Sequence, residues 1–172
     1  MIHTEQIIGR SIDIWSEWLG QRVLDIEAHV PQGVDELYEI QVGLSPSNRR
    51  YFIGWQQEDG PSDETLFYWL SMQHHSHFLA DLPRAGSLAP PLKTILDKTI
   101  LAVELYGWKA LDAVVAVIIQ CPGSTIGIAT TRYLLNKRNL SRLGIQELAV
   151  VEEDQLRAEL LRQDIEKVAD LR

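Results

Sequence analysis

The residues best suited to chemistry are histidines near the middle of the chain. His74, His75 and His77 lie within four residues, and on a helix His74, His77 and Asp81 would share one face at positions i, i+3 and i+7. Two imidazoles and a carboxylate, with one open coordination position, are ligands that suit catalytic zinc. A metal-dependent hydrolase is therefore one hypothesis for this chain.

Other observations weaken that hypothesis. In an extended segment His75 and His77 would share a face instead, and no HExxH spacing or remote cysteine pair supports a metal. A solvated polar stretch at the end of a strand explains the same residues. We therefore expect no bound cofactor.

Carboxylates on two expected neighbouring strands offer a second catalytic arrangement. Asp25 and the triplet Glu39-Ile40-Gln41 could together hold a divalent cation, as in a nuclease core. The match is poor, because Gln41 stands where such a core would carry a lysine. Alternating acidic residues also usually mark the solvent face of a strand.

Two further features point to structure rather than catalysis. Cys121, the only cysteine, lies beside an apolar run, where such a residue usually behaves as a small buried hydrophobe. The stretch Gly123-Ser124-Thr125 with Gly127 has glycines of the kind found in phosphate-binding loops, but no lysine follows at the Walker spacing. The sequence thus contains no specific catalytic motif.

Aromatic residues gather in two segments that would form paired strands. They are Tyr51, Phe52, Trp55, Phe67, Tyr68 and Trp69. Inward rings would belong to the core, whereas outward tryptophan and tyrosine are enriched at binding hot spots. We expect an interface that includes Tyr51, Trp55, Tyr68 and Trp69, with a purely core role or a small-ligand or sugar platform as alternatives.

Length and charge narrow the classes of function. The 172 residues are the size of one domain, and we expect residues 1–172 to form a single one. Its 24 acidic and 16 basic residues give a net charge of −8, which disfavours nucleic acid as a partner because phosphate neutralisation dominates such binding. A single cysteine excludes an internal disulfide, and the first residues lack a secretory pattern, so we expect a cytoplasmic protein.

Hydrophobic periodicity predicts the elements that would position these residues. Residues 4–20 carry apolar side chains at helical spacing, which predicts an amphipathic helix. Alternation with period 2 predicts strands over residues 24–30, 38–44 and 50–57, and the short polar turns between them favour an antiparallel meander. Residues 65–73 fit a fourth strand better than a helix because they are aromatic.

The uncharged block at residues 113–131 is the most apolar part of the chain. Polar residues near its centre argue against a membrane span, so we expect no membrane association. Its β-branched residues predict two buried strands joined by a Cys-Pro-Gly-Ser turn, with a helix pair as the alternative. A covering helix is expected before it, from Leu92 to about Tyr106, because Pro90-Pro91 would start a helix there.

The last residues, 152–172, predict a C-terminal amphipathic helix. They combine an apolar stripe at helical spacing with oppositely charged pairs at i, i+4. This helix would pack either on its own domain or on a partner subunit. Its interface candidates are Leu156, Leu160, Ile165 and Val168.

Together these patterns predict an α+β fold, with an N-terminal helix, an antiparallel β-meander of three or four strands, a covering helix, central apolar strands and a C-terminal amphipathic helix. They favour a non-enzymatic protein–protein interaction or assembly protein, oligomeric or a structural subunit of a larger complex. The alternative is a metal-dependent hydrolase or nuclease-like enzyme that uses the histidine cluster or the strand carboxylates. A small-molecule carrier is a third hypothesis.

Overall fold

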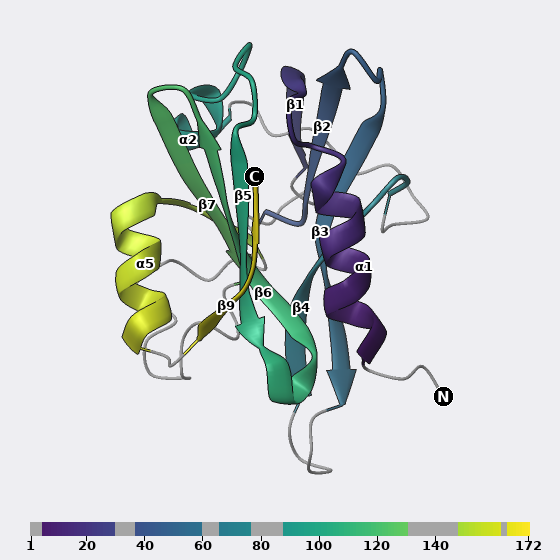
Figure 1. Ribbon diagram of the computed structural model, residues 1–172, viewed down its shortest axis with the longest axis vertical. Coiled ribbons are helices and arrows are strands. Elements are labelled where there is room, and N and C mark those ends of the chain that lie inside the picture. Colours follow the sequence, from purple (N-terminus) through teal and green to yellow (C-terminus); the bar gives the residue numbers. More distant parts are fainter. Residues whose placement is uncertain (1–4, 30–36, 60–65, 77–87, 131–147, 163–164) are drawn as a thin grey trace.

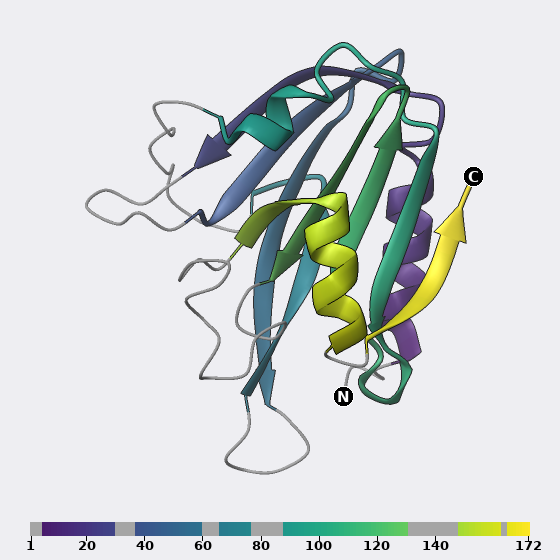
Figure 2. The same ribbon diagram turned by 90° about the vertical axis from the view of Figure 1, so that its left-hand side faces the viewer.

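The protein, in a computed structural model, is built of three layers. The structure describes residues 5–29, 37–59, 66–76, 88–130, 148–162 and 165–172. Helix α5 (Glu153–Arg162) covers one face of a five-stranded sheet, and a layer made of a four-stranded sheet and helix α1 (Glu5–Ser16) covers the other (Figure 1, Figure 2). This arrangement confirms the predicted α+β class.

The four-stranded sheet is the predicted meander. Strands β1 (Arg22–His29), β2 (Glu39–Ser45), β3 (Arg50–Asp59) and β4 (Leu66–Gln73) pair in sequence order, and all the pairs are antiparallel. The fourth strand, expected from its aromatic residues, places Trp69 opposite Gln56 of β3. β1 and β4 are therefore the two edges of this sheet.

The five-stranded sheet contains the predicted central strands. Its order is β8-β7-β6-β5-β9, formed by β5 (Ala102–Trp108), β6 (Ala113–Cys121), β7 (Ser124–Thr130), β8 (Leu148–Glu152) and β9 (Glu166–Leu171). β6 and β7 form a hairpin in which Cys121 pairs with Ser124, and Gly123 has the positive φ of 70° that the turn requires. None of the described helices is long and apolar enough to cross a membrane.

Two hydrophobic cores lie on opposite faces of the five-stranded sheet. The larger one fills the space between the sheets and α1, and the smaller one lies beneath α5. β6 supplies both: Val117 and Ile119 belong to the first core, and Ala116 and Ile118 to the second. Its side chains are therefore apolar on both faces, which explains why this stretch carries no charge.

The helix predicted from Leu92 to about Tyr106 is wrong. Only a short helix, α2 (Pro90–Lys93), forms there, Asp97 takes a left-handed φ of 62°, and the chain then enters β5. Residues 102–107 are buried in succession because β5 has a core on each face. The helical spacing came mainly from residues before this strand, such as Leu92, Ile95 and Ile100, which are buried in the larger core.

The helix predicted over residues 152–172 is only partly correct. α5 ends at Arg162, and the chain continues into β9, which pairs antiparallel with β5. Ile165 therefore precedes a strand, and Val168 lies within it. The segment after α5 extends the sheet instead of continuing the helix.

A cluster of ion pairs centred on Glu104 ties α5 and β9 to the sheet. The Glu104 side chain, on β5, is 3% exposed, and its carboxylate accepts Arg157 Nη2 of α5 at 2.6 Å and Lys167 Nζ of β9 at 2.5 Å. Arg157 also donates to the Tyr106 hydroxyl at 2.8 Å and to Glu153 at 3.1 Å. One buried carboxylate thus joins three elements of the fold.

Candidate functional site

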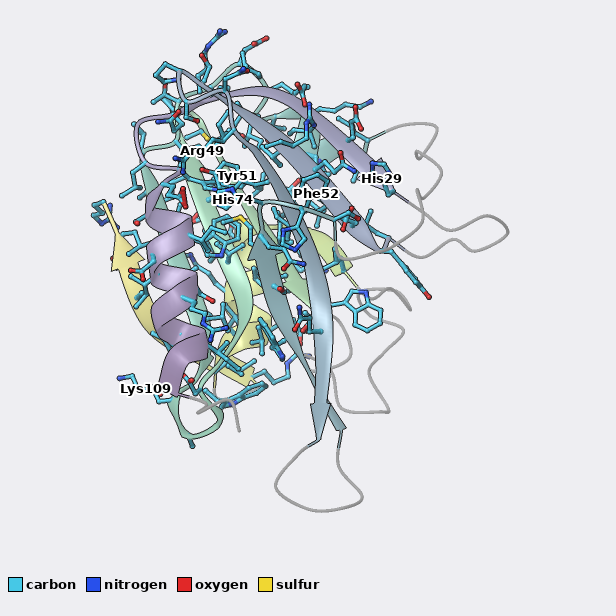
Figure 3. All side chains as sticks on the ribbon, turned by 90° about the vertical axis from the view of Figure 1, so that its right-hand side faces the viewer. His29, Arg49, Tyr51, Phe52, His74 and Lys109 are labelled. Carbon is cyan, nitrogen blue, oxygen red and sulfur yellow. The ribbon has the colours of Figure 1, made fainter. Side chains whose placement is uncertain are left out.

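A groove runs along the seam between α1 and the edge strand β4. Its volume is about 340 Å³, and it is lined by Ile7, Arg10, Ser11, Ile14, Gln56, Trp69, Ser71, Met72 and Gln73. Figure 3 views this layer, with α1 beside the strands of the four-stranded sheet. We call this feature the α1–β4 groove.

The periodicities of the two elements explain how the groove forms. On α1, Ile7, Ser11 and Ile14 fall at i, i+4 and i+7, on one face of the helix. On β4, Trp69 and Gln73 fall four residues apart, on one face of the strand. The α1 face and the outer face of β4 therefore form two walls of one depression.

The groove combines apolar walls with hydrogen-bond donors. The indole Nε1 of the half-buried Trp69 is shielded from solvent and has no hydrogen-bond partner in the described part of the chain. Ser11 and Ser71 are also buried. Among the lining residues that belong to the described part of the chain, Arg10 alone is ionisable. The described lining thus combines apolar side chains with polar groups and one exposed cation.

The first turn of α1, at one end of the groove, is held by a side chain from another layer. Asp112, after the short helix η1 (Lys109–Leu111), accepts the backbone N–H of Ile7 at 3.0 Å and that of Ile8 at 3.1 Å. The N–H of Ile7, the third helical residue, has no acceptor within the helix, and a carboxylate at this end also offsets the helix dipole. Asp112 thereby anchors α1 to the five-stranded sheet.

A polar cluster holds the other end of α1, one turn beyond Ile14. The Glu17 carboxylate contacts Arg49 Nη1 at 2.5 Å, His74 Nε2 at 3.4 Å and the Tyr51 hydroxyl at 3.4 Å. The Tyr51 ring packs against His74, with ring centroids 4.9 Å apart. Figure 3 shows Arg49, Tyr51 and His74 gathered beside this end of the helix.

The chemistry of this cluster suits anchoring. Burial, followed by the charge of Glu17, raises the pKa of Tyr51 above its ordinary value, so its phenol stays protonated and donates to the carboxylate. Glu17 is shared among three partners, which leaves it poorly placed as a general base. The cluster joins α1 to β3 and to the residue that follows β4.

The predicted interface residues lie in different environments. Tyr51, Leu156, Leu160 and Ile165 are buried in the two cores, and so they cannot form an exposed contact surface. Trp55 and Val168 are half-buried and pack against the larger core. Trp69 lines the α1–β4 groove. The Tyr68 side chain lies outside the described part of the structure.

The predicted metal site is only partly described. His74 pairs with Glu17, whereas His77 and Asp81 lie outside the described residues. Within those residues, no group of three or more histidine, cysteine, aspartate or glutamate side chains is arranged to hold a metal ion.

The strand carboxylates lie too far apart to share one cation. Asp25 is opposite Gly43 and Glu39 is opposite His29, four positions along the β1–β2 ladder, which is roughly 13 Å. Asp25 instead pairs with Arg50 at 2.9 Å, and buried Glu39 accepts the Ser76 hydroxyl at 2.9 Å. The structure thus corrects the nuclease-like grouping.

Cys121 is a structural residue. Its side chain is buried in the larger core, and burial raises the pKa of its thiol to about 11. A thiol of this kind is almost entirely protonated at neutral pH and is a weak nucleophile.

Most of the groove was not predicted. The sequence pattern assigned the apolar face of α1, which Ile7, Ile14 and Trp18 widen, to the core. Arg10, Ser71 and Gln73 gave no signal, because single polar residues at these spacings are common on any surface. The α1–β4 pairing that brings them together depends on contacts distant in sequence.

Comparisons with known proteins add no assignment, since the chain matches no protein-family model, no curated protein and no solved structure.

Proposed function

We propose that this chain is a non-enzymatic protein-binding module, acting as a subunit or adaptor of a larger assembly. The observation that carries the proposal is the α1–β4 groove, with Trp69 in its wall. A partner segment would seat one large side chain in the groove. The flanking polar groups would then contact its backbone.

The dimensions and composition of the groove support a side-chain anchor. About 340 Å³ is at the small end of ligand pockets, which makes it better suited to one anchoring group than to a large cofactor. Tryptophan is among the residues most enriched at energetic hot spots. Gln56 and Gln73 supply the polar rim that such interfaces typically have.

The placement of the reactive side chains also supports a binding role. Glu17, Glu104 and Asp112 each hold elements of the fold together, and the Cys121 thiol is buried with a raised pKa. Groups used in this way contribute to stability and are poorly available for turnover.

The free edge of β9 is a less suitable binding surface. Its register with β5 shifts between Leu105 and Tyr106, and Lys167 and Asp170 carry charge along the strand. Irregular pairing and charged side chains are devices that discourage an added strand at a sheet edge. This favours the groove over strand addition at β9.

The test is quantitative co-purification from cells of the source organism with wild-type protein and two variants. Trp69→Ala removes the groove wall. Leu24→Ala is the matched control, because Leu24 is an apolar side chain, 39% exposed, on β1 at the opposite edge of the same sheet. Circular dichroism would verify that both variants fold.

We expect at least one protein to be enriched with the wild type and Leu24→Ala and to be lost with Trp69→Ala. Light scattering on the purified complex would give its stoichiometry. The proposal fails if the protein remains a monodisperse monomer and recovers the same background with all three forms.

A further inference from the structure

We infer that residues 166–172, which we call the β9 strap, open as a unit while the rest of the fold stays intact, and that the closed strap covers the edge of β5. β9 lies at the end of the five-stranded sheet, beside β5 (Figure 2). This conformational equilibrium goes beyond the protein-binding role proposed for the α1–β4 groove and does not depend on it.

The burial of β9 differs from that of the strand at the opposite edge of the same sheet. None of the six residues of β9, all of which the structure describes, is buried. Val168, Ala169 and Leu171 reach the larger core only as partly buried side chains. In β8, by contrast, three of the five residues are buried. Because segments with little buried apolar surface open at a lower free energy than global unfolding, β9 should open before its sheet does.

Ile165, directly before β9, provides a fixed pivot for the opening. Its side chain is buried in the smaller core, and its backbone N–H donates to the Leu160 carbonyl of α5 at 2.9 Å. β9 begins at the next residue, Glu166, which is exposed. An opening that starts between Ile165 and Glu166 therefore leaves α5 in place.

The ion pairs of the strap show which charged contact holds it closed. Lys167 pairs with Asp170 at 3.5 Å, and Asp170 pairs with Arg172 at 3.0 Å, so both contacts stay within the strap. The contact of Lys167 Nζ with the Glu104 carboxylate, at 2.5 Å, crosses to β5. When it breaks, Glu104 keeps Arg157 Nη2 at 2.6 Å and is not left as an uncompensated buried charge. Lys167 thus serves as the latch of the strap.

The open state uncovers a strand edge that is apolar on both faces. Val103 and Leu105 of β5 belong to the larger core, and Tyr106 belongs to the smaller one. Unpaired backbone N–H and C=O groups along such an edge accept an added strand. The sequence of β9 fits this edge, so the closed strap blocks a site that a second copy of the same strand could occupy.

Native-state hydrogen exchange, followed by NMR on the intact chain, tests the opening. The amides of β5 bond in turn to β6 and to β9, as in any antiparallel sheet. We expect the amides between β5 and β9 to share one rate, at least about 100-fold faster than the amides between β5 and β6. Equal rates would show that β9 opens only with the whole fold and would overturn the inference.

Two substitutions in the strap test the latch. Lys167→Met removes the contact with Glu104 and should speed the exchange of the β5–β9 amides about tenfold. Arg172→Met is the matched control, because the pair of Arg172 with Asp170 persists when the strap opens, and it should leave the rate unchanged. Acceleration by both substitutions, or by neither, would exclude Lys167 as the latch.

A fluorescein-labelled peptide of residues 165–172 tests the uncovered edge. Fluorescence polarisation should show Kd about tenfold lower for Lys167→Met than for the wild type, because the peptide competes with a weakened strap. Arg172→Met should match the wild type. Equal affinity for wild type and Lys167→Met, or binding to neither, would reject the edge as a strand acceptor.

Discussion

Replacing Arg157 with methionine should destabilise the fold by about 3 kcal/mol at neutral pH. The substitution retains an apolar chain of similar length and removes the guanidinium that lies 2.6 Å from the Glu104 carboxylate. Glu104 would remain buried, with Lys167 as its remaining cation. A buried charge that loses a partner retains most of its desolvation cost, which is why the expected effect is large.

The exposure of Arg157 and Lys167, the partners of Glu104, determines the size of the expected loss of stability. Loss of one member of a buried pair typically costs about 3–5 kcal/mol. We take the lower end because the Arg157 side chain is 33% exposed and Lys167 stays in place. Glu104→Gln should cost less, about 1–2 kcal/mol, because both cations it releases can turn toward water. The two variants should therefore rank Arg157→Met above Glu104→Gln.

Urea unfolding at constant m-value measures this ranking. For a chain of this size, about 3 kcal/mol corresponds to a fall in Tm of roughly 6–12 °C. Equal losses in the two variants, or a larger loss in Glu104→Gln, would refute the reasoning, because the buried carboxylate would then not be the group that needs its partners.

The pH dependence provides a second check. Burial alone would raise the pKa of Glu104, but hydrogen bonds and charge from Lys167 and Arg157 outweigh it and hold this pKa below the ordinary value of 4.5. The folded state therefore gains stability from the ionised group above that value and loses it as pH falls through the lower, folded pKa. The gap between wild type and Arg157→Met should shrink on acidification, and a gap that widens would contradict the assignment.

Three further predictions concern single residues. Asp112→Ala should lower the free energy of unfolding by about 1–2 kcal/mol because the first turn of α1 loses its acceptor. Asp112→Asn keeps an oxygen and tolerates the left-handed φ of 48°, so it should cost less than half as much in urea unfolding. Equal costs for the two variants would exclude capping. Gly127→Ala should cost about 1–3 kcal/mol because its Cβ would lie 2.3 Å from Leu156 Cδ2. The control Gly9→Ala, with nothing within 4 Å, should be neutral or stabilising in the same thermal melts. Cys121 should react with Ellman's reagent at pH 8 at least about 100-fold more slowly in the native protein than in urea, because its buried thiol is protonated, and rapid native labelling would disprove this.

The parts of the fold that were predictable are those whose local pattern has one explanation. β1 and β2 alternate apolar and polar residues because one face of their sheet, with Ile26, Val42 and Leu44, is buried in the larger core. The β6–β7 hairpin was predictable because β-branched residues flank Pro122-Gly123, a pair that suits only a turn.

The errors arose where apolar spacing is ambiguous. β5 lies between two cores, so it lacks alternation, and Leu92, Ile95 and Ile100 before it mimic a helical face while all three are buried in the larger core. In the last segment, Ile165 and Val168 fit the stripe of α5, yet the chain pairs with β5. The ion pairs of Glu104 that favour this pairing join residues more than fifty positions apart in sequence, and no local pattern can reveal them.

The α1–β4 groove could not be predicted either, because its walls come from elements distant in sequence. Its width depends on where α1 lies relative to β4. Two polar contacts help to set that position, because Asp112 holds the first turn of the helix and Glu17, the residue that follows its last turn, holds the other end. Close packing of Trp15 holds α1 against the larger core, and directional hydrogen bonds near both ends of the helix add to that constraint. The chain thus uses buried and half-buried polar groups, which sequence reading would assign to catalysis, to fix the helix that forms one wall of the groove.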